Sequence, residues 1–122
     1  MKTALWCSRH APSTAQLAEV AAMGYEIAAL DDGLRLGAMN LADDDDLNAV
    51  LTELLDLAAT HSAEACFGVF AAPVQECLLR TKQGGMPCYA AWNIQRSADG
   101  GKPTFEHRRF CRVGALSDEA LR

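Results

Sequence analysis

The chain has 122 residues, of which half are hydrophobic and 22% are charged, a balance typical of a folded domain and not of a disordered segment. Its 16 acidic and 11 basic residues give a formal net charge of -5, which argues against a general duplex-DNA binder because such proteins carry a basic stripe. No apolar run approaches the roughly 20 residues that a membrane-spanning helix needs, and we expect no secretory signal. We therefore expect one cytoplasmic domain over residues 1–122.

The N-terminal segment has the pattern of a strand–helix–strand unit. Residues 3–7 form a short apolar run, which predicts a buried strand. Ser13 and Gln16 stand at the spacing of a capping box, so a helix should begin beside them. Gly24 is placed to end this helix in a left-handed conformation, and residues 25–30 predict the second strand. Together these segments have the length of a βαβ unit.

The middle of the chain predicts two further helices with a strand between them. Four aspartates at 43–46 place negative charge where a helix N-terminus favours it. Apolar residues then recur at helical spacing over 47–58, the clearest helix in the sequence. Residues 65–70 predict a buried strand, and Pro73 suits the first turn of a helix that the glycines at 84–85 would end.

The C-terminal part predicts a hairpin. Residues 88–94, with two aromatic side chains, predict a fourth strand. A turn signal follows, and residues 105–113 can return as an antiparallel edge strand whose charges discourage aggregation. The expected organisation is a βαβαβαβ body over 1–94, a hairpin with an edge strand over 95–113 and a tail over 114–122.

Strands that alternate with helices predict an α/β, Rossmann-like fold of three layers, with a mostly parallel sheet and right-handed crossovers. We expect the strand order 2-1-3-4, with the fifth, antiparallel strand at the edge beside the fourth. In such a sheet a crevice opens at the carboxyl ends of strands 1 and 3, and ligands bind there. Residues 8–10 and 71–73 follow those two strand ends, and Trp92 and Asn93 end the neighbouring strand. A polar cluster is thus predicted at the expected ligand site.

The five cysteines have the pattern of neither a metal site nor a disulfide framework. Their number is odd, their spacing is wide and no Cys-x-x-Cys pair occurs. Cys66, Cys77 and Cys88 lie within apolar stretches and are expected to act as small buried hydrophobes in a reducing cytoplasm. No metal site and no cofactor is predicted.

The segment after the first strand carries groups suited to a phosphate. Arg9 offers a planar fork of donors that matches phosphate oxygens, and His10 can give or take a proton near neutral pH. Ser8, Thr14 and Gln16 add hydroxyl and amide groups near a helix N-terminus, which favours anions. A structural interpretation stays open: Gln16 would only cap the helix, Arg9 would pair with a surface acid and His10 would bind a loop carbonyl.

Two resemblances rest on this segment alone. Arg9-His10-Ala11-Pro12 after a strand resembles the arginine–histidine–glycine loop of histidine phosphatases, which would make His10 the phosphorylated residue. The glycine of that loop is absent, and the chain's other histidines are His61, at a helix end, and His107, in the edge strand. Trp6-Cys7 is similar to the start of a thioredoxin motif, but the resolving cysteine is absent.

A third resemblance covers more of the chain. Residues 5–12, with Gln16 after them, are similar to the first loop of small CRISPR-linked proteins of the ring-nuclease type, stand-alone relatives of the nucleotide-sensing CARF domains. Residues 68–74 and the helix after them resemble the next ligand-facing strand and helix of that family. The resemblance implies a Rossmann-like homodimer that binds a cyclic oligoadenylate. Cleavage of the ring without a metal is a further implication, and binding without cleavage stays open.

The resemblance also implies roles for single residues. Ser8 and Arg9 would bind the phosphate, and His10 would be the acid or base of a cleavage step. Trp92 would stack on a base. The residues implied in ligand binding are Ser13, Thr14, Gln16, Ala72, Pro73, Gln75, Trp92 and Asn93. The alternatives are a non-catalytic nucleotide- or protein-binding module of a mobile element or defence locus, and a histidine phosphatase.

Overall fold

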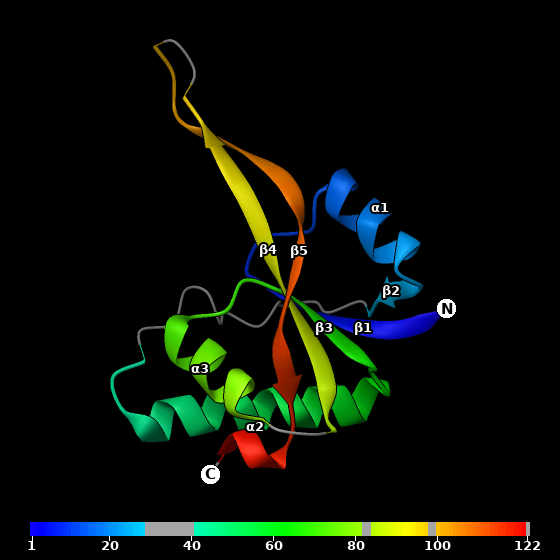
Figure 1. Ribbon diagram of the computed structural model, residues 1–122, viewed down its shortest axis with the longest axis vertical. Helices are drawn as coiled ribbons and strands as arrows, with labels where there is room; N and C mark the ends of the chain where they lie inside the picture. The colour runs from blue at the N-terminus through cyan, green and yellow to red at the C-terminus, as the bar shows by residue number, and fades with distance from the viewer. Residues whose placement is uncertain (29–40, 82–83, 98–99, 122) are drawn as a thin grey trace.

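The structure is a computed structural model that describes residues 1–28, 41–81, 84–97 and 100–121. Over these residues, five strands form one mixed sheet in the order β2-β1-β3-β4-β5 (Figure 1). Neighbouring strands from β2 to β4 run parallel, and β5 runs antiparallel to β4, which confirms the predicted fold class and strand order. The elements are β1 (Lys2–Cys7), α1 (Thr14–Ala22), β2 (Tyr25–Ile27), α2 (Asp44–His61), β3 (Ala65–Gly68), α3 (Ala72–Arg80), β4 (Met86–Arg96), β5 (Thr104–Leu116) and the 3-10 helix η1 (Asp118–Leu121).

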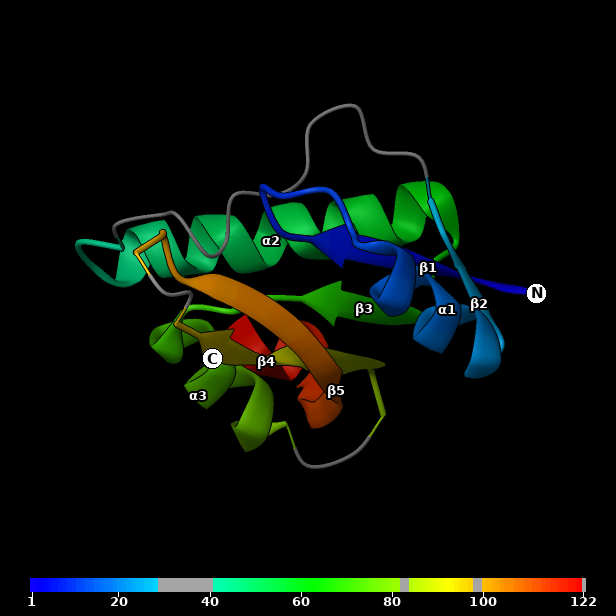
Figure 2. The same ribbon diagram turned by 90° about the horizontal axis from the view of Figure 1, so that it is seen from above.

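The sheet separates two layers of helices and two apolar clusters. In Figure 1, α1 lies above β1 and β2 and beside the β4–β5 hairpin, whereas α2 and η1 lie at the bottom of the molecule. Figure 2 shows β1, β3 and β4 side by side from above. Side chains of β1 belong to both clusters, one on each face of the sheet. Leu5 and Cys7 pack with α2 and α3, and Ala4 and Trp6 pack on the other face with Val20 of α1. All of these side chains are buried because both faces of the strand are covered.

The helix starts follow the predicted capping chemistry. Ser13 Oγ accepts from the Gln16 amide at 3.1 Å, and Gln16 Oε1 accepts from the Ser13 amide at 2.8 Å, so the capping box is confirmed. Gly24 follows α1 with a φ of 93°, as predicted for its helix end. At α2, the Asp43 side chain accepts from the Asp46 amide at 2.9 Å.

Some element bounds differ from the prediction. β3 ends at Gly68 and not at residue 70, and α3 ends at Arg80, well before the glycine pair at 84–85. The predicted tail over 114–122 is wrong for most of its length. Its first residues belong to β5, and η1 follows, because Leu116 and Ala120 are buried against α2 and α3. Residues 29–40, which include the end of the predicted second strand, and residues 98–99 of the predicted turn lie outside the described residues.

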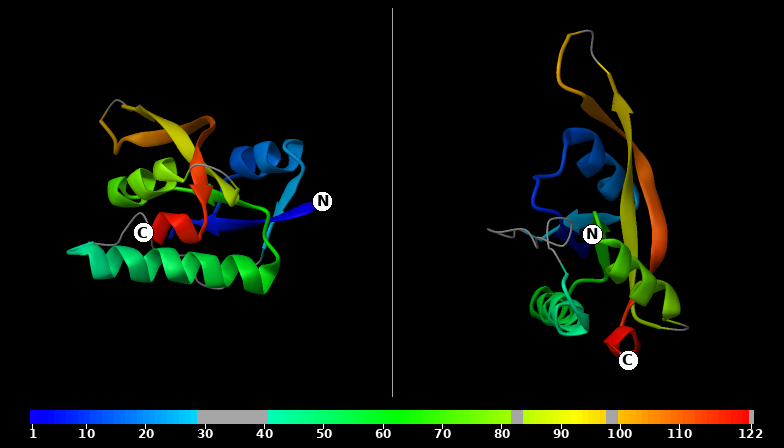
Figure 3. Two further views of the ribbon diagram at one scale, coloured as in Figure 1. Left: turned by 60° about the horizontal axis from the view of Figure 1, so that its bottom comes forward. Right: turned by 90° about the vertical axis from the view of Figure 1, so that its left-hand side faces the viewer.

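The β4–β5 hairpin is longer than predicted and extends away from the rest of the molecule (Figure 3). Its pairing shifts register twice, between Cys88 and Tyr89 and between Trp92 and Asn93. Trp92 pairs with Arg109 and Asn93 pairs with His107, so Arg108 is the extra residue of a β-bulge. Bulges increase strand twist, and the hairpin accordingly curls toward α1.

A carboxylate of α1 bridges to the curled part of β5. Glu19 Oε2 accepts from the Phe110 amide at 2.8 Å, and Glu19 Oε1 lies 2.8 Å from His107 Nε2. The His107 side chain is only 6% exposed and that of Glu19 is 27% exposed. The contact joins residues about 90 positions apart and holds α1 against the hairpin.

We expect Glu19→Ala to lower the free energy of unfolding by about 1.5–3 kcal/mol, the range for hydrogen bonds to a charged group. The variant lacks the carboxylate and therefore loses its contacts with His107 and with the Phe110 amide at once. Urea unfolding of the wild type and the variant measures the difference. Glu26→Ala, at an exposed position of β2, is the control and should stay within about 0.5 kcal/mol of the wild type. Equal losses in the two variants would contradict the bridging role of Glu19.

The five cysteines are free, and four of them are buried in the cluster between the sheet and α2 and α3. Cys7 and Cys66 are in thiol contact across β1 and β3, with 2.7 Å between their Sγ atoms. Cys66 pairs in register with Cys88 of β4. The prediction that Cys66, Cys77 and Cys88 act as buried hydrophobes is confirmed. Burial raises the pKa of the Cys66 thiol, and the contact with Cys66, followed by burial, raises the pKa of Cys88.

These raised pKa values predict a loss of stability at alkaline pH. An unfolded thiol loses its proton near its ordinary pKa of 9.0, whereas Cys66 and Cys88 keep theirs in the folded protein. Above about pH 9 the unfolded state therefore binds fewer protons, and the free energy of unfolding falls by up to about 1.4 kcal/mol per pH unit for each thiol. Below that pH the contribution is constant.

Urea unfolding at about pH 8 and about pH 10, in a reducing buffer, measures this dependence. The double variant Cys66→Ala, Cys88→Ala should show a smaller decline between the two pH values. Cys111→Ala, which removes a half-buried thiol of β5, should keep the wild-type decline. A decline of the same size in all three proteins would refute the assignment to the core thiols.

Candidate functional site

The candidate site begins with the segment Ser8–Pro12, which follows β1 and is called the elbow below. The indole Nε1 of buried Trp6 donates to the carbonyl of His10 at 2.6 Å, and the His10 amide donates to Ser8 Oγ at 3.3 Å. These bonds hold the turn against the sheet, and Ser8 is itself buried. Arg9 and His10 are exposed, with the Arg9 Nε–H donating to His10 Nε2 at 3.3 Å. The elbow therefore presents a guanidinium and an imidazole to solvent on a hydrogen-bonded support.

The elbow lies beside the segment that leads into α3. Cys7, the last residue of β1, pairs with Gly68, the last residue of β3, and the Val69 amide donates to the Cys7 carbonyl at 3.3 Å. Gly68 has a φ of 155°, and a Cβ at this position would lie 2.5 Å from the Cys7 oxygen. This close approach requires glycine. Because the two strand ends adjoin, the loops that leave them start side by side at the carboxyl edge of the sheet.

The first turn of α3 has amides without a side-chain cap. The N-cap residue Ala71 makes no side-chain hydrogen bond, and Pro73 has no amide hydrogen. Gln75 uses its Nε2 to donate to the Phe70 carbonyl at 2.9 Å, so this side chain supports the loop. Ala72 at the helix start is exposed and has no polar side chain that could occupy an amide of this turn, and a helix start of this kind favours anions.

Other predicted ligand residues have structural partners. Ser13 and Gln16 are engaged with each other in the capping box, and Thr14 is exposed at the start of α1. Trp92 and Asn93 lie on β4 beyond Ala90, the residue that pairs with Gly68. Within the described ranges, no hydrogen bond or ring contact joins Trp92 or Asn93 to the elbow. The structure thus places the elbow and the segment that leads into α3 at adjoining strand ends, and it places Trp92 and Asn93 on the hairpin.

The chemistry available at the elbow is anion binding and proton exchange. In the part of the chain that the structure describes, Arg9 forms no ion pair with a carboxylate, so the expected surface acid is not found there. Because His10 Nε2 accepts from Arg9, the neutral imidazole carries its proton on Nδ1. The guanidinium keeps its remaining donors available for phosphate oxygens.

The other two histidines lie away from the elbow. His61 is the last residue of α2, which leads into the amino end of β3, the opposite edge of the sheet. His107 is buried against Glu19. The arrangement therefore offers His10 no second histidine of the kind that histidine phosphatases use. Cys7, which would be the thiol of a thioredoxin-like motif, is fully buried against Cys66.

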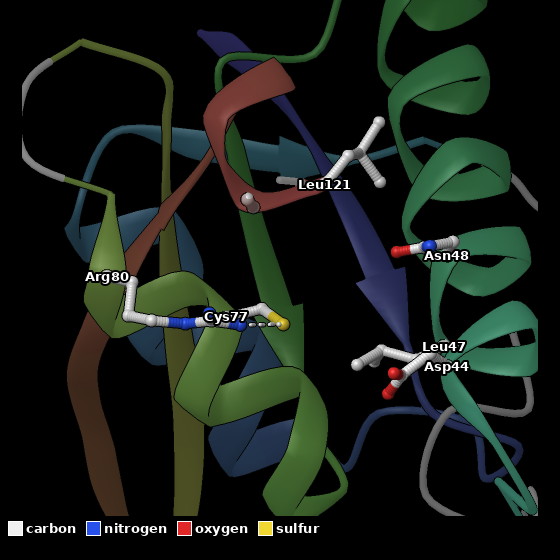
Figure 4. A pocket seen from close by; sticks show the side chains of 7 residues that line it. Asp44, Leu47, Asn48, Cys77, Arg80 and Leu121 are labelled. Atoms are coloured by element: carbon white, nitrogen blue, oxygen red, sulfur yellow. Dashed lines mark hydrogen bonds between the residues drawn. The ribbon is translucent and has the colours of Figure 1, made fainter.

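A cavity of about 230 Å³ lies elsewhere, between α2, α3 and η1 (Figure 4). In Figure 4, the Arg80 side chain lies along α3 and donates to Cys77 Sγ at 3.0 Å, facing Asp44 and Asn48 of α2. Sequence reasoning did not predict this cavity, because one wall is η1, which lies in the segment expected to be a tail. Its lining residues are Asp44, Leu47, Asn48, Cys77, Arg80, Ala120 and Leu121.

Searches against family models, curated proteins and solved structures found no match to this chain. Of the helices that the structure describes, none combines the length and the apolar character needed to cross a bilayer. Among the same residues, no group of three or more histidine, cysteine or acidic side chains is arranged to hold a metal ion. The site is therefore defined by its own geometry: an exposed arginine and histidine beside the start of α3.

Proposed function

We propose that this protein binds the phosphodiester of a cyclic oligoadenylate at the carboxyl edge of its sheet. The observation that carries the proposal is the exposed Arg9 guanidinium, which has no carboxylate partner among the described residues. It lies on an elbow that leaves β1 where β3 also ends, and the segment after β3 leads to the uncapped start of α3. A planar donor fork and free helix amides are both suited to phosphate oxygens. The resemblance of residues 5–12 and 68–74 to ring-nuclease proteins supports a cyclic adenylate as the ligand.

Three residues of the elbow have roles in this proposal. Arg9 holds the phosphate oxygens and stabilises the charge that develops on them. Ser8 positions the elbow, because its hydroxyl accepts from the His10 amide. When Arg9 turns to the phosphate and releases His10 Nε2, that nitrogen takes the proton of the ribose 2′-hydroxyl. The hydroxyl oxygen then bonds to the adjacent phosphorus while the bond from phosphorus to O5′ breaks. The products are a 2′,3′-cyclic phosphate and a 5′-hydroxyl, whose proton comes from water or from the histidine.

The proposal includes a two-fold dimer in the cytoplasm. A cyclic ligand with repeated phosphates can be held by the same elbow from each of two protomers. The free cysteines are consistent with a reducing compartment. Light scattering after gel filtration measures the molecular mass with and without the cyclic ligand. A protein that stays monomeric when the ligand is present would refute the two-fold site.

A binding module without catalysis is the second candidate, and one experiment separates the two. The protein is incubated with cyclic tetra-adenylate and cyclic hexa-adenylate in EDTA, and binding is measured by calorimetry while the products are separated by chromatography. Binding with ring opening supports the nuclease. Binding with an intact ring supports the module. Absence of both binding and cleavage for both rings would refute the proposed function.

A further inference from the structure

The β4–β5 hairpin carries an exposed aromatic ring between cations. The Arg108 and Arg109 guanidinium carbons lie 4.7 Å and 5.4 Å from the centre of the Trp92 ring. Trp92 is 44% exposed, and both arginines are exposed. We call Trp92, Arg108 and Arg109 the indole–arginine patch. A large aromatic side chain left in solvent beside two arginines that form no ion pair among the described residues has the composition of a binding surface.

The β-bulge creates this grouping. In a regular antiparallel pair, consecutive residues of β5 would point to opposite faces, and only one of them could reach a given side chain of β4. The extra residue at Arg108 allows both arginines to approach Trp92, with Arg109 as its paired residue. The patch is therefore built by a specific backbone feature, and bulges often redirect side chains at functional positions.

The charge of the hairpin differs in sign from that of the chain. Residues 86–116 contain five basic and two acidic residues, in a protein with a net charge of -5. Arg96 is paired with Glu106 at 3.0 Å, whereas Arg108 and Arg109 form no ion pair within the described residues. The hairpin also extends from the body of the molecule, away from α2, whose first turn holds three aspartates (Figures 1 and 3).

We propose that the indole–arginine patch binds single-stranded nucleic acid. A base stacks on Trp92 or on the guanidinium plane beside it, and the adjoining phosphates are held by Arg108 and Arg109. A single strand is favoured over a duplex because its bases are free to stack. It is favoured over an acidic protein segment because such a segment would use the charges and leave the exposed indole without a role. This surface is independent of the cyclic ligand proposed at Arg9.

Fluorescence anisotropy with a labelled adenine strand of about 12 nucleotides tests the proposal. We expect the wild type to bind it at low salt and to bind a duplex of equal length more weakly. Trp92→Ala should reduce the affinity about 10-fold or more, and Trp92→Phe should retain most of it because a ring remains. The double variant Arg108→Gln, Arg109→Gln should weaken binding and lower the dependence of log affinity on log salt by about 1.4, or about 0.7 for each lost phosphate contact.

The controls separate this surface from the elbow and from a purely structural role. Arg9→Ala should bind the linear strand as the wild type does, so failure of the cyclic-ligand proposal would leave this one standing. Circular dichroism verifies the fold of each variant. The proposal is overturned if the wild type does not bind the strand, or if Trp92→Ala and the arginine double variant bind it unchanged. Stronger binding of an acidic peptide than of the strand would overturn it in favour of a protein partner.

Discussion

Replacing Arg9 by alanine is expected to weaken the binding of a cyclic oligoadenylate by about 10- to 150-fold. The variant loses hydrogen bonds between a guanidinium and a phosphate, which contribute about 1.5–3 kcal/mol. Arg9 is exposed and lies on a loop, so the fold should be unaffected. Calorimetric titration of the wild type and of Arg9→Ala measures the change. Arg9→Lys should recover only part of the affinity, because an ammonium lacks the bidentate fork.

A matched arginine provides the control for this prediction. Arg80 is also exposed, but it lies at the end of α3 and bonds to Cys77 at the cavity between α2, α3 and η1. Arg80→Ala should therefore leave the affinity for the cyclic ligand unchanged. If Arg9→Ala binds as tightly as the wild type, the anion binds elsewhere and the role of the elbow is wrong.

Replacing Gly68 by alanine is expected to lower the free energy of unfolding by about 3 kcal/mol or more. The new Cβ would lie 2.5 Å from the Cys7 oxygen and 2.7 Å from the Cys7 carbonyl carbon, which belong to the backbone of β1. Backbone atoms of a paired central strand cannot move aside without breaking the sheet. The φ of 155° adds strain for any residue with a Cβ. Urea unfolding measures the loss.

Gly24→Ala is the matched control, since Gly24 also has a positive φ, of 93°, but nothing lies within 4 Å of its added Cβ. Its cost should be about 1–2 kcal/mol, from backbone conformation alone. The difference between the two variants therefore measures the close approach of β1 and β3. A Gly68→Ala loss that does not exceed the Gly24→Ala loss would contradict the close approach on which the site depends.

The parts of the fold that were predicted correctly depend on local chemistry and on general rules of topology. The capping box of Ser13 and Gln16 and the glycine end of α1 involve neighbours in the sequence. The strand order follows from alternating strands and helices with right-handed crossovers. Because the same rules place strands 1 and 3 side by side, the sequence alone predicted that the ends of these strands adjoin, and this is confirmed by the pairing of Cys7 with Gly68. That the elbow and the start of α3 share a ligand stays a prediction.

The features that were missed depend on contacts between distant residues. η1 is held in place because Ala120 is buried against α2 and α3. A single small apolar residue in a short polar segment does not predict a helix from the sequence. The Glu19 bridge needs the curl of the hairpin, and the bulge at Arg108 that increases this curl has no local sequence pattern. Trp92 was predicted at the end of the fourth strand, beside the ligand crevice, whereas β4 continues to Arg96. The sequence did not indicate that two arginines lie against its ring.

The most direct test of the proposed site is a titration of ¹⁵N-labelled protein with cyclic tetra-adenylate, followed by two-dimensional amide spectra. We expect the ligand to change the chemical shifts mainly of the amides in residues 8–10 and 69–75. Arg9→Ala should suppress these changes at the same ligand concentration. Changes confined to the hairpin, or to the cavity between α2, α3 and η1, would contradict the proposed site, as would spectra that do not change at saturating ligand.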